Sequence, residues 1–164
     1  MKALVTYYTK TGNTEKIARA IYEEIHFGKE LIPIKDVKSL KDYDVIFAGF
    51  PVQAHSVPAA FLPFFKNLPA GQNIALFCTH GSLRGGHLPK QAIEHALGLA
   101  SRMRVLGTFC VRGQVDPKVI DSMANMAQHQ AWAQEAAGAC DHPDAADLAD
   151  AKAFAKTVLA RLGH

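Results

Sequence analysis

The chain opens on Ala3-Leu4-Val5-Thr6-Tyr7-Tyr8, followed at once by Thr9-Lys10-Thr11-Gly12-Asn13-Thr14. The first run is apolar and β-forming and predicts a buried strand, whereas the second is polar and turn-forming. Isoleucines then recur at every fourth position from Ile17 to Ile25, which predicts an amphipathic helix over roughly 14–26. A strand, a polar loop and a helix in this order are typical of a parallel sheet covered by helices.

Strand-like and helix-like stretches continue to alternate along the rest of the chain. They predict a three-layer α/β/α fold of the flavodoxin-like type, with a five-stranded parallel sheet in the order 2-1-3-4-5. Ser56 is the expected N-cap of the first helix after the third strand. The further strands are expected at 30–34, 45–50, 74–78 and 105–111, and the further helices at 58–68, 89–102 and 148–162.

Length and composition fit a single globular domain. The chain has 164 residues, of which 49% are hydrophobic and 20% charged, so it can bury a core without disulfides. No apolar run reaches the roughly 18 residues of a membrane helix, and no cleavage site follows the first strand. We therefore expect one cytoplasmic domain over 1–164, with an added helical segment at about 113–143.

Cysteine usage gives no sign of a disulfide framework or a metal site. The three cysteines, Cys78, Cys110 and Cys140, are an odd number and lie far apart. No C-x-x-C pair and no Cys/His ligand spacing occurs in the sequence. We accordingly expect no metal centre.

The loop at 9–14 carries the most specific signal. Hydroxyl side chains, one glycine and the free N–H groups of a helix start are suited to hold a phosphate. The loop is neither the triphosphate motif G-x-x-x-x-G-K-[ST] nor the dinucleotide motif G-x-G-x-x-G. The alternative is that its Thr and Asn side chains only cap the helix and form a turn, but capping needs just one such residue.

Thr-x-Thr-Gly-Asn-Thr after the first strand resembles the phosphate loop of flavodoxins, and the resemblance covers residues 1–112 and the last helix. It implies that the cofactor is FMN, held without a covalent bond, with the loops near 51–55 and 79–86 beside the isoalloxazine ring. The implied cofactor-binding residues are Thr9, Lys10 through its backbone, Thr11, Gly12, Asn13, Thr14, Pro51, Val52, Gln53, Ala54, His55, Thr79, His80, Gly81, Gly85 and Gly86.

The two flavin-side loops depart from the flavodoxin pattern. Electron-carrying flavodoxins usually stack aromatic rings on the flavin, but these loops contain no Tyr or Trp, which leaves His55 and His80 as candidates for tuning it. Either histidine is also consistent with an ordinary polar loop residue. Loop 51–57 also lacks the glycine whose peptide flips beside reduced flavin in typical flavodoxins. Trp132 in the added segment is expected to pack against the domain, with covering the flavin or forming a subunit contact as alternatives.

Charge is distributed unevenly along the chain. The net charge is +3, yet residues 45–113 hold six basic side chains and only one acidic side chain, Glu94. Arg84, Lys90 and Arg112 are candidates for a positive rim that steers acidic partners, nicotinamide phosphates or carboxylate substrates to the flavin. Scattered solvated charges are the alternative. The basic stretch has no interleaved aromatic platform, so it does not indicate nucleic-acid binding.

A different activity is suggested by the stretch from Cys78 to Arg84, which fits C-x-x-G-x-x-R. In cysteine-dependent phosphatases such a loop supplies a thiolate nucleophile and an arginine that clamps the phosphoryl oxygens. Against this activity, Gly85 stands where those enzymes have Ser or Thr. Cys78 also ends an apolar strand, where a free cysteine is most often a small buried hydrophobe.

We therefore expect an FMN-binding electron-transfer protein that passes reducing equivalents to a partner enzyme or a small acceptor, as a monomer or homodimer. An NAD(P)H-dependent FMN or quinone reductase is the main alternative, because it would share the phosphate loop. A flavodoxin-like fold without cofactor, acting as a binding module, is a further alternative. The intact loop at 9–14 argues against the binding module.

Overall fold

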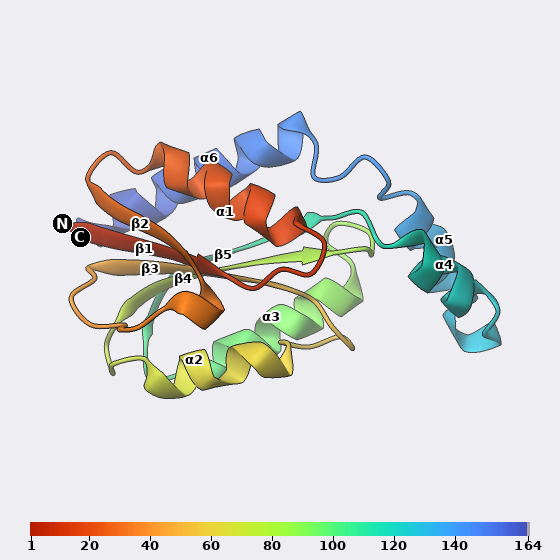
Figure 1. Ribbon diagram of the computed structural model, residues 1–164, viewed down its shortest axis with the longest axis horizontal. Coiled ribbons are helices and arrows are strands. Elements are labelled where there is room, and N and C mark those ends of the chain that lie inside the picture. Colours follow the sequence, from red (N-terminus) through yellow and green to blue (C-terminus); the bar gives the residue numbers. More distant parts are fainter. Residues whose placement is uncertain (164) are drawn as a thin grey trace.

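The computed structural model describes residues 1–163 and confirms the predicted α/β/α fold (Figure 1). Five parallel strands form one sheet in the order β2-β1-β3-β4-β5. The strands are β1 (Lys2–Tyr7), β2 (Gly28–Pro33), β3 (Val45–Pro51), β4 (Asn73–His80) and β5 (Arg104–Arg112). The helices are α1 (Asn13–Glu24), α2 (Leu62–Asn67), α3 (His87–Leu99), α4 (Pro117–Ala124), α5 (Gln130–Ala137) and α6 (Ala145–Leu162), with 3-10 turns η1 (Ile34–Asp36), η2 (Ala59–Phe61) and η3 (Ala127–His129).

Two apolar layers hold the sheet between its helices. On the face covered by α1 and α6, Phe47 and Phe77 pack with Ile21. On the face covered by α2 and α3, Phe50 packs against Phe61. All five side chains are fully buried, because the central strands are covered on both faces and successive residues point to opposite layers.

The fourth strand is longer than expected. Its backbone pairs with β5 as far as the Thr79–Val111 and His80–Arg112 positions, so Thr79 and His80 belong to the strand and not to the following loop. Both side chains are buried as a result. The sequence predicted a loop here because polar residues follow the apolar run.

The helix expected over 58–68 is only partly formed. It begins as the η2 turn and becomes α-helical at Leu62. Ser56 is not its N-cap, because the Ser56 hydroxyl bonds to Nδ1 of His95 in α3. The next helix, α3, spans His87–Leu99 instead of 89–102.

The carboxyl ends of all five strands lie at one edge of the sheet, where ligands bind in folds of this kind. The loops after β1, β3 and β4 meet at this edge. The segment at 113–143 folds into α4, η3 and α5, which extend beyond the same edge (Figure 1). None of the helices over residues 1–163 is long and apolar enough to cross a membrane.

Candidate functional site

The loop between β1 and α1 leaves the start of α1 open to a ligand. The N-cap residue is Gly12, whose φ of 92° lies in the left-handed region, and no side chain caps the helix. Thr9 Oγ1 accepts a hydrogen bond from the Gly12 N–H at 3.0 Å. The backbone N–H groups of residues 13–15 have no acceptor among residues 1–163. These three N–H groups are available to an anion, which favours a phosphate site over a mere cap.

Two side chains of this loop hold it in position. Thr14 Oγ1 lies 2.9 Å from Thr79 Oγ1 in β4, and both residues are buried. Asn13 Nδ2 donates to the carbonyl oxygen of Gln114 at 2.8 Å, in the added segment. Because these side chains are engaged, a ligand at this loop meets the backbone N–H groups and the exposed Thr11.

A cavity of about 890 Å³ joins this loop to the loops after β3 and β4. Its volume lies within the range of about 300–1,000 Å³ for ligand sites. The predicted residues that line it are Lys10, Thr11, Asn13, Thr14, Pro51, Val52, Gln53, Ala54, His55, Thr79, His80 and Gly81. The structure therefore brings three distant loops together at one place.

Four predicted residues do not line the cavity. Thr9 and Gly12 belong to the phosphate loop and shape it through their mutual hydrogen bond, and Thr9 lines a different cavity. Gly85 and Gly86 lie outside because the chain turns away after Leu83, whose carbonyl accepts from the Gly86 N–H at 3.0 Å. Their contribution is to the turn, where Gly85 has a φ of 74°.

The added segment supplies a further wall of the cavity, which the sequence indicated only as an alternative placement for Trp132. Its amphipathic pattern and its single tryptophan were visible in the sequence, but the pattern does not reveal where a helix docks. The residues of this wall are Val115, Asp116, Val119, Met123, Gln128, His129 and Trp132.

His80 presents an unpaired acceptor beside the cavity. Its Nδ1 lies 3.1 Å from the carbonyl oxygen of Ser82, so Nδ1 carries the proton and Nε2 keeps a lone pair. Nε2 is buried and has no hydrogen-bond partner among residues 1–163. Burial lowers the pKa of His80 to about 4, and the nearby Arg112 charge lowers this pKa as well. The ring is therefore neutral near pH 7.

The loop after β3 forms a tight two-residue turn. Gln53 and Ser56 exchange two backbone hydrogen bonds, of 3.1 and 2.9 Å. Between them, Ala54 and His55 have φ values of 46° and 60°, the left-handed conformation of a type I′ turn. The loop thus adopts this conformation without a glycine, which is a strained arrangement for both residues. Both are exposed.

The sequence predicted a positive rim of Arg84, Lys90 and Arg112, but two of these side chains are bound to other parts of the chain. The Arg112 guanidinium donates to the carbonyl oxygens of Glu135 at 2.5 Å and Gly138 at 3.2 Å, in and just after α5, and to that of Ser82. Arg84 forms an ion pair of 2.7 Å with Asp150 in α6. Arg112 therefore binds the added segment to the sheet through backbone carbonyls, and Lys90 is exposed.

The phosphatase expectation is also wrong. Cys78 is fully buried in β4, and its thiol donates to Sγ of Cys110 on β5 at 2.8 Å. Burial raises the pKa of the Cys78 thiol well above its ordinary value. A nucleophile must be ionised and accessible, and this cysteine is neither.

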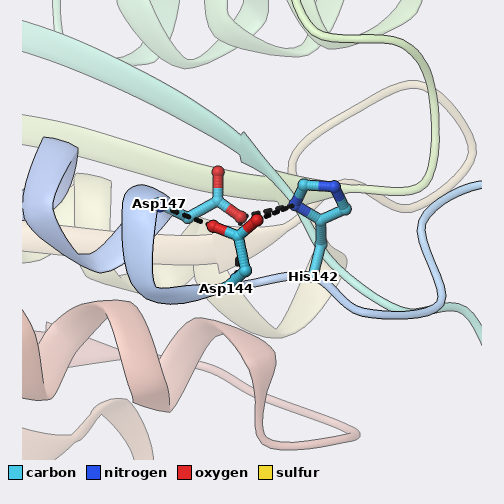
Figure 2. A group of neighbouring side chains, drawn as sticks. All are labelled: His142, Asp144 and Asp147. Atoms are coloured by element: carbon cyan, nitrogen blue, oxygen red, sulfur yellow. Dashed lines mark hydrogen bonds and ion pairs between the residues drawn. The ribbon is translucent and has the colours of Figure 1, made fainter.

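A histidine and two carboxylates meet where α6 begins, and Figure 2 shows how they lie. Asp144 Oδ1 accepts from the Asp147 N–H and Asp147 Oδ2 accepts from the Asp144 N–H, both at 2.9 Å. His142 Nδ1 lies 2.5 Å from the same Oδ2 atom. Helix capping accounts for the two aspartates, which form a capping box, and His142 is a further partner of Asp147.

A second cavity, of about 830 Å³, lies between the end of β2 and α2. It is lined by Tyr8, Ile34 and Phe64, among others, and it contains Glu15 but not the residues of the loops after β3 and β4. The first cavity is the better candidate for the ligand, because it joins the phosphate loop to the loops after β3 and β4 and the second does not.

Comparison with known proteins identifies the family. The model of the Flavodoxin domain family matches residues 4–156. The flavodoxin-like domain-containing protein BilS of Clostridioides difficile (strain CD3) is 29% identical over 177 residues, covering 97% of each chain. A flavodoxin from the domain Archaea has a TM-score of 0.69 at 20% identity, over 100% of both chains. A Lactobacillus acidophilus NCFM flavoprotein, solved in complex with FMN, has a TM-score of 0.53 at 22% identity, over 74% of this chain and 97% of that one. Because the family match spans most of the sequence, this chain belongs to the flavodoxin domain family.

Proposed function

We propose that this protein binds FMN without a covalent bond and passes reducing equivalents to a partner enzyme or a small acceptor. FMN supplies the redox chemistry, and the chain supplies binding, orientation and electrostatics. The observation that carries the proposal is the set of three unpaired N–H groups at the start of α1, beside a cavity that the two flavin-side loops also line. Membership of the flavodoxin domain family supports FMN as the occupant.

The phosphate end of the cavity has the charge that a monophosphate requires. The N-terminus of α1 carries a partial positive charge, and Lys10 is exposed nearby. Glu15, the one acid in the first turn, is bonded to Arg19 at 2.6 Å, which offsets its negative charge. Residues 13–15 would hold the phosphate through their backbone, with Thr11 and Lys10 beside it.

The other end of the cavity suits a flat ring with polar edges. Pro51, Val52 and Pro89 provide apolar surface. The lone pair on His80 Nε2 provides an acceptor, which matches the ring N–H groups of a flavin. The chain therefore offers a donor-rich site for the phosphate and an acceptor beside the ring.

The phosphate assignment is tested by comparing FMN with riboflavin, which lacks the phosphate. We expect FMN to bind at least about 100-fold more tightly. Thr11→Asp should remove most of this difference, because a carboxylate repels the phosphate, and should leave riboflavin affinity within about 3-fold. Thr11→Ser retains the hydroxyl and serves as the matched control. Equal affinity for FMN and riboflavin in the unmodified protein would contradict the proposal.

The direction of electron flow is tested by anaerobic titration of the FMN-loaded protein. Stepwise chemical reduction, followed by separate additions of NADH and NADPH, is monitored by the visible spectrum. A carrier is reduced by the chemical reductant and stays oxidised in NADH and NADPH. Direct bleaching by either nicotinamide would identify a reductase, the alternative that shares the phosphate loop.

A further inference from the structure

The cavity has one large aromatic side chain besides its histidines, and it does not come from the loops after β3 and β4. Among the lining residues, Trp132 in α5 is the only Phe, Tyr or Trp. It is half-buried, and it is also the only tryptophan of the chain. A flat apolar ring bound in this cavity therefore has one neighbour among Phe, Tyr and Trp, beside the histidines of the lining.

The apolar face of α4 lies against the same cavity without a protein partner that buries it. No residue of α4 is buried, although the helix is amphipathic. Val119 and Met123 line the cavity, and Val119 is 41% exposed. The cavity continues from this face to the unpaired N–H groups of α1, so a single ligand with a phosphate and an apolar ring can occupy both ends.

The position of α5 is fixed by specific contacts to the end of β4 and the loop after it. A Cβ on Gly81 would lie 2.4 Å from Val115 Cγ2 and 3.6 Å from Trp132 Cζ2, so glycine permits this close approach. Glu135 accepts from the Leu83 N–H at 3.2 Å. Trp132 is thus held beside the segment that sequence reasoning placed next to the flavin ring.

We propose that Trp132 contacts the isoalloxazine ring of bound FMN and that α4 and α5 together cover the cofactor. The inference rests on the proposed function, because it takes FMN as the occupant of the cavity. The added segment then supplies the aromatic contact that loops 51–57 and 79–87 lack. It also shields one side of the ring from water and leaves less of the ring exposed to a large partner.

The first test measures FMN affinity in variants of Trp132. We expect Trp132→Leu to weaken FMN binding about 10-fold, because aromatic stacking is lost, and Trp132→Phe to stay within about 3-fold. The ratio of FMN to riboflavin affinity should not change, because the phosphate end is untouched. Bound FMN should be strongly quenched in fluorescence beside Trp132 and should emit more in Trp132→Leu.

The second measurement keeps an indole ring at position 132 and separates the two proposals. Protein labelled with 5-fluorotryptophan gives one ¹⁹F resonance, which should shift on addition of FMN and stay in place on addition of inorganic phosphate. FMN binding without a shift, or an unchanged affinity in Trp132→Leu, would overturn the role of Trp132 and leave the proposed function standing. Failure of the unmodified protein to bind FMN would overturn the proposed function itself.

Discussion

The sheet and the added segment of this protein are held by different forces. In the sheet, β1, β3 and β4 bury nearly every side chain in two apolar layers. In the added segment, α4 buries no residue and α5 buries only Ala133 and Ala136. Polar contacts fix that segment instead: Arg112 donates to carbonyls of the α5 region, and the Gln114 N–H bonds to the His142 carbonyl at 2.8 Å.

The difference teaches that a few hydrogen bonds can position a helical segment that has no core of its own. Apolar burial contributes roughly 25 cal/mol per Å², so the sheet accumulates far more stabilisation than the segment. The segment is expected to open more easily than the sheet, because local stability follows buried apolar contact. The three predictions below break or sharpen this contrast.

The largest effect is expected from Phe47→Ala in the sheet. Phe47 is fully buried and packs edge-to-face on Phe154 of α6, with ring centroids 6.2 Å apart. Removing the ring should lower the free energy of unfolding by about 3–5 kcal/mol in urea denaturation. Met126→Ala in the added segment is the matched control, since Met126 is 43% exposed, and it should change the free energy by less than about 0.5 kcal/mol. Similar losses in both variants would contradict the contrast.

The next prediction concerns how the free energy of unfolding depends on pH through His80, which lies where the sheet meets the added segment. The Gly113 N–H bonds to the His80 carbonyl, and burial lowers the pKa of the His80 ring from 6.5 to about 4. Between pH 6.5 and about 4, His80 binds a proton in the unfolded chain but not in the folded protein. The free energy of unfolding therefore falls as the pH drops through this range. The expected loss is on the order of 3 kcal/mol.

His80→Asn should flatten this pH dependence in urea denaturation series. His26→Asn is the control, because the His26 side chain is 81% exposed. A slope in His80→Asn equal to that of the unmodified protein would show that another group titrates in this window.

The smallest effect is a local one, expected from Arg112→Met. This change removes the donor shared by the carbonyls of Ser82, Glu135 and Gly138. We expect about 2 kcal/mol of local destabilisation, which corresponds to roughly 30-fold faster amide hydrogen exchange in α4 and α5, with unchanged exchange in β1 and β3. Arg84→Met, which removes an exposed ion pair to Asp150, should leave exchange in both regions nearly unchanged. Equal acceleration throughout the chain would refute a separately held segment.

The sheet was predictable because its signals are local. Runs such as 45–50 are apolar on both faces, which is required of central strands and of few other elements. Predictions that depended on a distant partner were less secure. Ser56 has the right chemistry for a helix cap, but His95, far along the chain, takes its hydroxyl instead.

The site was predictable in its loops and not in its far wall. Topology alone places the loops after β1, β3 and β4 at one edge, which is why most of the predicted residues share a cavity. The docking of α4 and α5 depends on Arg112, whose charge the sequence shows but whose carbonyl partners it does not. For the same reason, Arg112 was expected to face solvent as part of a positive rim.

The hydrogen bond from Asn13 to Gln114 joins the start of α1 to the start of the added segment. If an anion binds at the start of α1 as proposed, its binding and the ordering of α4 and α5 share this contact. By thermodynamic reciprocity, the two then stabilise each other by the same free energy. The resistance of residues 113–143 to a protease is then expected to rise as the proposed site fills, which reports its occupancy without observing the ligand.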